Sequence, residues 1–147
     1  MKAKSIIEEL RAHHNEMRKL QKEIEDDRSK YIILKKHLDV HHELEEDILL
    51  SELHKNDAVK NESLESKEEH FVLNFLLMDL ADFPQDNFRW PIKFQVFSEI
   101  LNHHLEEEEE DLFPEAEKHL SKNKLEEFGA RFSELKEKRL KYELQIK

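Results

Sequence analysis

Two segments of the chain each place a histidine four residues before a glutamate, within matching patterns of apolar residues. His41 precedes Glu45 in the first segment, and His104 precedes Glu108 in the second, 63 residues further along. Residues four apart in an α-helix lie one above the other on the same face, so each segment offers an imidazole and a carboxylate to one point. The apolar residues that recur at equivalent positions are Leu34, Leu38 and Leu49–Leu50 in the first segment and Phe97, Leu101 and Leu112–Phe113 in the second.

A glutamate on an otherwise apolar helix face is costly to bury unless it is paired or bound to a cation. Two such glutamates in matched positions predict one shared metal site between helices. Two more histidines occupy apolar positions of other predicted helices, which brings the candidate ligands to six. These are His14, His41, Glu45, His70, His104 and Glu108.

Four imidazoles and two carboxylates that can each bridge suit a pair of metal ions. A set of nitrogen and oxygen ligands without sulfur favours iron, with zinc or manganese as possible substitutes. With an oxo or hydroxo bridge from solvent, such a pair retains an open coordination position, where small molecules bind.

The histidine doublets leave two choices of ligand open. His13 is the alternative to His14, and His42, which could pair with Glu46, is the alternative to His41. We favour His14 and His41 because only the His41 register aligns the two repeats. The remaining histidines are not expected to be ligands: His103 flanks one, and solvent-facing positions are predicted for His37, His54 and His119.

The helices that must position these residues are indicated by apolar residues at helical spacing. We expect helices over residues 5–27, 30–55 and 66–82, a fourth that starts near Pro91 and is kinked or restarted at Pro114, and a last one over 121–145. Residues 56–63 read as a connection. The predicted fold is all-α: an antiparallel up-and-down four-helix bundle with an additional C-terminal helix. Residues 1–147 are predicted to form a single domain, with its core over about 5–120.

Composition agrees with a helical protein and excludes several classes of function. The 147 residues include one glycine, three prolines and no cysteine, so disulfides, thiolate metal sites and a cysteine nucleophile are excluded. The net charge of −11 disfavours nucleic acid and anionic membranes as partners. No apolar run is long enough to span a membrane and no export signal is evident, so we expect a cytoplasmic protein. The aromatic residues expected in the core are Phe71, Phe75, Phe88, Trp90, Phe94, Phe97, Phe113, Phe128 and Phe132.

The segments that carry the candidate ligands resemble the hemerythrin-like family, the HHE cation-binding domain. The matching stretches are LRAHHNEM (10–17), LDVHHELEEDILL (38–50), EEHFVL (68–73) and LNHHLEEEEEDLFP (101–114). The resemblance implies a non-haem di-iron centre in a four-helix bundle, with the same six residues as ligands. A ferritin-like bundle is disfavoured because no histidine follows a glutamate by three residues.

One position departs from the family's oxygen carriers, which place two histidines four apart on the third helix. Here His70 is followed by Asn74 at that spacing. The reduced set resembles the sites of iron–sulfur repair proteins, although those carry a cysteine segment that this chain lacks, and the sites of iron- and oxygen-sensing domains.

The function that we expect is the binding or reaction of O2, NO or H2O2 at an open iron position. The alternative is an iron- or oxygen-responsive regulatory or storage module without turnover. A plain helical bundle or a structural zinc site is a weaker third hypothesis.

Overall fold

The computed structural model of the chain describes residues 4–145, and it is helical along nearly all of that range. The connections between the long helices are short, and the described residues contain no strand. The elements are α1 (Ile6–Asp26), η1 (Arg28–Lys30), α2 (Tyr31–Leu44), η2 (Glu45–Leu50), α3 (Ser51–Leu53), α4 (Lys60–Asp82), α5 (Trp90–Glu107), η3 (Glu108–Leu112), α6 (Phe113–His119) and α7 (Lys122–Gln145).

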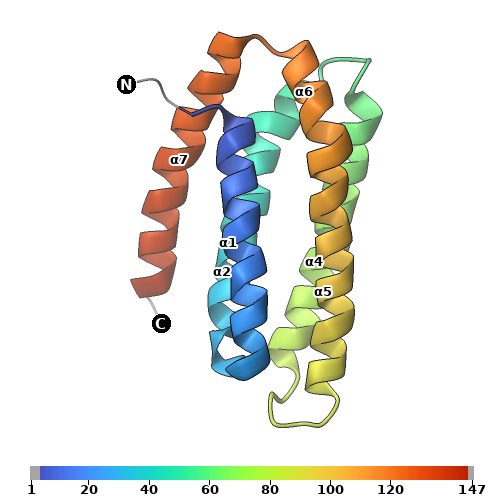
Figure 1. Cartoon of the computed structure of the whole chain (residues 1–147), viewed down its shortest axis with the longest axis vertical. Helices are drawn as coiled ribbons and strands as arrows, with labels where there is room; N and C mark the ends of the chain where they lie inside the picture. The colour runs from blue at the N-terminus through green and yellow to red at the C-terminus, as the bar shows by residue number, and fades with distance from the viewer. Residues whose placement is uncertain (1–3, 146–147) are drawn as a thin grey trace.

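Four helical rods lie side by side and form an up-and-down bundle (Figure 1). They are α1, α2 with its continuation through η2 and α3, α4, and α5 with its continuation through η3 and α6. The last helix, α7, lies outside the bundle against α1 and α2. The predicted all-α bundle with an additional C-terminal helix is therefore confirmed.

Local sequence signals account for where the first helix begins. Ser5 accepts a hydrogen bond from the backbone N–H of Glu8, and the Glu8 side chain accepts one from the backbone N–H of Ser5. This reciprocal capping satisfies two of the backbone N–H groups that have no partner within the first turn of a helix. The helix ends at Asp26, one residue before the predicted end.

The third long helix, α4, begins at Lys60, within the stretch that the sequence indicated as a connection. Two serines of its polar first turns are part of the packed interior. Ser63 is buried and donates a hydrogen bond to the carbonyl oxygen of Leu50, and Ser66 donates one to Glu108. Serines of this kind look like cap or loop residues in a sequence, because their partners lie on other helices.

Each candidate glutamate stands at the start of a π-helical turn. Glu45 begins η2 and Glu108 begins η3. A π turn contains an extra residue and so changes which side chains face the core. In η2 three consecutive residues, Ile48 to Leu50, are buried. The second π turn also lets the rod pass Pro114 without a break, since Pro114 lies in the first turn of α6, where no intrahelical N–H bond is required. The predicted restart at Pro114 agrees with the start of α6 at Phe113, which follows η3 without an intervening loop.

The apolar interior consists of two separate clusters. One contains Ile6, Leu44 and Phe113 together with residues of α7, and the other contains Met17, Leu77 and Trp90 near the opposite end of the bundle. Six of the nine aromatic residues that were expected in the core are buried. Phe71, Phe75 and Phe88 are exposed, so that part of the prediction is wrong. Phe71 and Phe75 lie beside the inward stripe of α4, which His70, Leu73 and Leu77 define.

The single glycine permits α7 to approach the start of α1. A Cβ atom at Gly129 would overlap the carbonyl oxygen of Lys4 and lie 2.8 Å from the backbone nitrogen of Ile6. Because both atoms belong to the backbone, they cannot rotate away. Gly129→Ala is therefore expected to lower the free energy of unfolding by about 2–4 kcal/mol, measured by urea denaturation. Arg131→Ala, at an exposed position of the same helix, is the control. Equal stability of the two variants would contradict this account.

Candidate metal centre

The six predicted residues converge in a buried polar layer of the bundle. His14 comes from α1, His41 from α2, Glu45 from η2, His70 from α4, His104 from α5 and Glu108 from η3. All six are buried. As the helical spacing predicted, each of these side chains lies on the inward face of its own rod.

The ring Nε2 atoms of the four histidines point at the two carboxylates. Oε1 of Glu108 lies 3.3 Å from His14 Nε2, and Oε2 lies 3.5 Å from His104 Nε2 and 3.6 Å from His70 Nε2. Glu108 thus presents one oxygen to each side of the layer. Oε1 of Glu45 lies 3.1 Å from His70 Nε2 and 3.7 Å from His41 Nε2.

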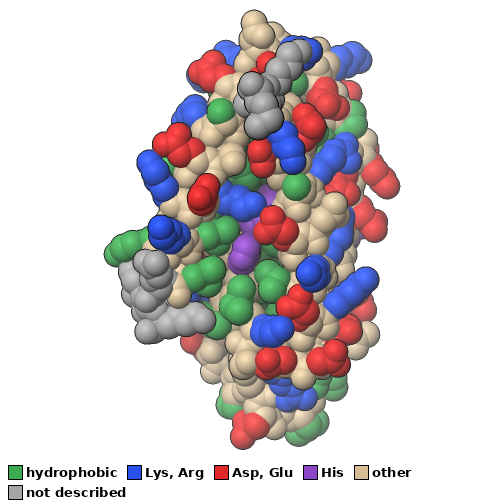
Figure 2. Space-filling view, turned by 60° about the vertical axis from the view of Figure 1, so that its left-hand side comes forward, with side chains coloured by type: hydrophobic (Ala, Val, Ile, Leu, Met, Phe, Trp, Pro, Cys, Tyr) green, Lys and Arg blue, Asp and Glu red, His purple; other side chains and the backbone are tan. Residues whose placement is uncertain are grey.

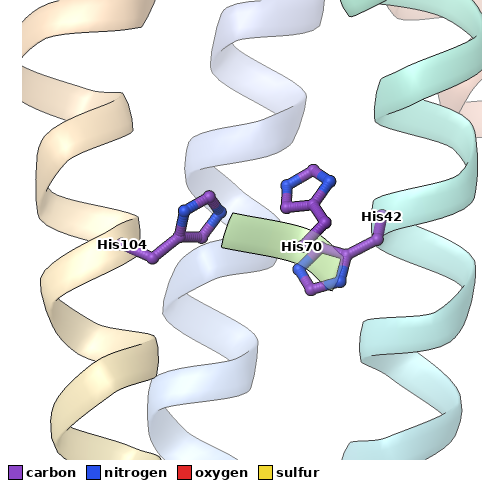
Figure 3. Close-up of side chains that lie close together, drawn as sticks. All are labelled: His42, His70 and His104. Carbon is purple, nitrogen blue, oxygen red and sulfur yellow. The ribbon is translucent and has the colours of Figure 1, made fainter. Parts of the chain in front are cut away.

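A seventh residue, His42, also faces this layer. Its ring lies 3.9 Å from that of His70, centroid to centroid and nearly parallel, and 5.9 Å from that of His104. Figure 3 shows His42 and His70 side by side, with His104 approaching from the opposite helix. The sequence predicted His41 and His42 as alternative ligands, but both rings point inward.

The position at which the oxygen carriers have a further histidine is occupied by Asn74, which is exposed. His42 brings an additional imidazole to the layer from a different helix. In the sequence His42 stood as the alternative to His41, with Glu46 as its possible partner. The structure turns both rings toward the layer.

Buried polar atoms without a hydrogen-bond partner concentrate here. Within the described residues, ten such side-chain atoms occur, and only the oxygens of Gln21 and Ser98 lie elsewhere. The others are the Nε2 atoms of His14, His41, His42, His70 and His104, both oxygens of Glu45 and Oε1 of Glu108. Unsatisfied buried groups are expensive, and a cation between them satisfies all of them at once. The donor set therefore fits a pair of metal ions.

The outward-facing nitrogens of three rings are held by glutamates. Nδ1 of His14 donates to Glu109 at 2.7 Å, Nδ1 of His70 donates to Glu46 at 2.9 Å, and Nδ1 of His104 donates to Glu69 at 2.6 Å. These bonds fix each ring with its Nε2 lone pair turned inward, the arrangement that metal-binding histidines require. Sequence reasoning did not find these roles: Glu69 and Glu109 were not singled out, and Glu46 was considered only as a partner of His42. Each lies next to other acidic residues on a partly exposed face.

His41 has a different outer partner. Its Nδ1 lies 2.8 Å from Nδ1 of His13, whose Nε2 lies 2.9 Å from Nδ1 of His37. The choice of His14 over His13 for the inward position agrees with this geometry, although His13 is buried as well. The prediction that His37 faces solvent is wrong, because it is half-buried and hydrogen-bonded to His13.

Without a cation, the buried groups shift one another's pKa values strongly. Burial opposes a charge on His14, but hydrogen bonds to Glu108 and Glu109 outweigh it and raise the pKa of His14 to about 9. Burial and the neighbouring Glu108 raise the pKa of Glu45 to about 7. Burial and the neighbouring imidazoles lower the pKa of His41 and His42. Protons thus take up part of the role that a cation would have in this layer.

The metal-free protein is expected to lose stability as the pH rises above 7. The folded-state pKa of His14, about 9, exceeds the unfolded value of 6.5, so its stabilising effect is complete below pH 6.5 and disappears as the pH rises through 9. Urea unfolding of chelator-treated protein should show a decrease of about 1–3 kcal/mol between pH 7 and pH 9. His14→Gln should flatten that profile. A wild-type profile that is already flat over this range would contradict the assignment.

A cleft between α2 and α4 leads to the polar layer. It has a volume of about 720 Å³, and His42 and His70 line it together with exposed and half-buried residues. Its other lining residues are Lys35, Asp39, Glu43, Glu46, Lys67, Glu68, Phe71, Asn74, Met78, Ala81 and Asp82. Carboxylates outnumber lysines, so neutral molecules and cations enter more easily than anions.

No helix in residues 4–145 combines the length and the apolar character that crossing a membrane requires.

Comparison with known proteins agrees with the site. The family model described as hemerythrin HHE cation binding domain matches residues 5–116. A crystal structure of a hemerythrin HHE cation binding domain-containing protein from Mycobacterium kansasii superposes with a TM-score of 0.84 at 23% identity, over 98% of this chain and 94% of that one. At this identity the likeness shows the fold alone. No curated protein matches the chain. Because the family model covers more than half of the sequence, including all six predicted ligands, the chain belongs to the hemerythrin HHE cation-binding family.

Proposed function

We propose that the chain binds two iron ions in the polar layer and that a small neutral molecule, O2, NO or H2O2, binds there. The observation that carries the proposal is the convergence of eight unsatisfied buried atoms from five histidines and two glutamates. Zinc or manganese can occupy the same nitrogen and oxygen ligands.

The geometry suggests how the ligands divide. One group of ligand atoms that lie within 4.8 Å of one another comes from His14, His41 and Glu108, and another comes from Glu45, His70, His104 and Glu108. Glu108 belongs to both groups, so it would contribute a ligand to each of them. His42 forms a third group with His70 and His104, so we add it as a seventh ligand on that side.

Iron bound at these positions would supply electrons and an open coordination position for a small molecule. The protein supplies the rest. The outer glutamates hold the imidazoles in place, the two apolar clusters enclose the layer toward the two ends of the bundle, and the cleft between α2 and α4 provides a path for the small molecule.

The test is iron loading under anaerobic conditions, followed by exposure to air. We expect about two irons per chain and a charge-transfer absorption band, both lost in His104→Ala. His103→Ala is the matched control, because this neighbour is exposed and its ion pair is with Glu107. A folded wild-type protein that retains almost no iron would refute the proposal.

A second candidate function is an iron-responsive regulatory or storage module. It is favoured by the polar layer itself, which joins four helices through charged groups between two apolar clusters. A cation that binds only the folded form stabilises it by mass action. Rapid turnover of peroxide or NO favours the reactive centre. A large iron-dependent gain in protease resistance without turnover favours the module.

A further inference from the structure

Three histidines form a continuous chain from the polar layer toward the surface. His41 contacts His13 through their Nδ1 atoms at 2.8 Å, and His13 contacts His37 through Nε2 and Nδ1 at 2.9 Å. A carboxylate oxygen of Glu16 lies within 4.8 Å of ligand atoms of His13 and His37. The outer end of the chain therefore carries two imidazoles and one carboxylate, none of which belongs to the proposed di-iron centre.

We propose that His13, Glu16 and His37 form a second site, for one divalent transition metal ion, which is available only while the inner centre is empty. The mutual exclusion of the two sites rests on the proposed function of the inner centre. The existence of the outer site does not depend on it.

The donor set and its spacing suit such an ion. Two imidazoles and a carboxylate on one side of a cation are a common arrangement for ferrous iron and related metals. The distance of 2.9 Å between the two ring nitrogens agrees with about 3 Å between adjacent ligands at right angles around an ion with bonds of about 2.1 Å. The ligands come from two helices, with His13 and Glu16 on successive turns of α1 and His37 on α2.

The site is accessible from solvent. His37 is half-buried, and the side chain of Glu16 is 51% exposed. Figure 2, in which the α7 side of the molecule is turned forward, shows histidine side chains at the bottom of a hollow with hydrophobic, basic and acidic side chains around it.

A lysine from α7 competes with the cation. Nζ of Lys136 lies 3.3 Å from Oε1 of Glu16, and its side chain is largely buried. A metal ion must displace this ammonium group from the carboxylate. Lys136 therefore lowers the affinity of the outer site for a metal ion, and its substitution should raise that affinity. Loss of a ligand should have the opposite effect.

The exclusion follows from counting protons along the three neutral rings. Each of the two ring-to-ring contacts holds one proton, so the third proton is at one end of the chain. If His41 binds a metal through Nε2, its proton is on Nδ1, and His13 must then carry its proton on Nε2, facing His37. That proton blocks the outer site. If His13 binds a metal through Nε2, the order reverses, and the proton on His41 Nε2 blocks the inner centre.

Transfer of an ion from the outer site to the centre then needs no net change in protonation. As the ion leaves His13 Nε2 for His41 Nε2, the proton between the two Nδ1 atoms passes from His13 to His41. His13 Nε2 takes up a proton from water and His41 Nε2 releases one, so each ring remains neutral. The outer site would thus collect an ion and release it inward.

The first experiment measures Co2+ binding by absorption and calorimetry in a full-length variant whose centre is disabled by His104→Ala and Glu108→Gln. We expect about one ion per chain, an affinity more than about tenfold lower when His37→Ala is added, and a higher affinity when Lys136→Met is added. His103→Ala is the matched control. Absence of binding, or binding that His37→Ala leaves unchanged, overturns the proposal.

The second experiment uses the wild-type chain and does not depend on the folding of the multiple variant. Co2+ should saturate at two ions per chain, and His37→Ala should slow loading without changing that number. Imidazole 15N NMR of the zinc-loaded protein should place the His13 proton on Nε2. A third equivalent bound at saturation, or a proton on Nδ1 of His13, overturns the exclusion.

The two proposals fail in distinguishable ways. If the wild type binds one Co2+ that His37→Ala removes and His104→Ala does not, the di-iron proposal fails and the outer site stands. If the wild type binds two ions at an unchanged rate in His37→Ala, and the centre-disabled variant binds none, the outer site fails and the di-iron proposal stands.

Discussion

Glu45→Gln is expected to stabilise the metal-free protein and to weaken its binding of iron. Burial and the carboxylate of Glu108 raise the pKa of Glu45 to about 7 from 4.5, so ionisation of Glu45 at higher pH costs stability in the folded state. Glutamine has the same shape and carries no charge. Urea unfolding at pH 8 should therefore show a gain of about 1–3 kcal/mol.

The same substitution should lower the affinity for iron by about 100-fold or more, because it removes a charged ligand whose Oε1 lies 3.1 Å from His70 Nε2 and 3.7 Å from His41 Nε2. A competitive chelator titration measures this effect. Glu110→Gln, at an exposed position of η3, should change neither quantity. If Glu45→Gln destabilises the metal-free protein and binds iron normally, Glu45 is a structural residue and the central argument fails.

His42→Phe is expected to weaken or abolish binding of the iron on the side of His70 and His104, while the iron on the side of His14 and His41 remains. The phenyl ring can keep the packing against His70, whose ring lies 3.9 Å away, but it offers no nitrogen to the metal. Loss of one of the imidazoles on that side should lower the affinity of that ion by about 10- to 100-fold. Iron analysis after dialysis against a weak chelator should then give about one iron per chain.

The control for this variant is His54→Phe, since His54 is exposed on the same helical rod, beyond η2. Two tightly bound irons in His42→Phe would show that the predicted set of four histidines and two glutamates is sufficient, and that His42 only packs against His70.

The outer partners of the ligands make the two sides of the centre unequal. His14, His70 and His104 each donate to a carboxylate, whereas His41 contacts the neutral ring of His13. A carboxylate makes an imidazole a stronger donor than another imidazole does. The side of the layer that contains His41 should therefore hold its ion less tightly.

The family's motif was readable in the sequence because it depends on contacts within single helices. His41 with Glu45 and His104 with Glu108 are separated by one turn, so their spacing alone places imidazole and carboxylate on one face. The same local rule, applied to the apolar residues, predicted the long helices and hence the bundle. The start of α1 also depends on local contacts, because Ser5 and Glu8 cap it reciprocally and lie close in the chain.

Properties that depend on contacts between helices were decided by the tertiary structure. The sequence alone determined which residues share a helix face and that six of them suit a metal pair. Packing of α1 against α2 brought His41, His13 and His37 into contact. The π turns that begin at Glu45 and Glu108 changed which side chains face the core. Both rings of the His41–His42 doublet turned inward. The physical reason is that these arrangements depend on the rotation of each rod about its axis and on its distance from its neighbours, which interactions between residues far apart in the chain determine.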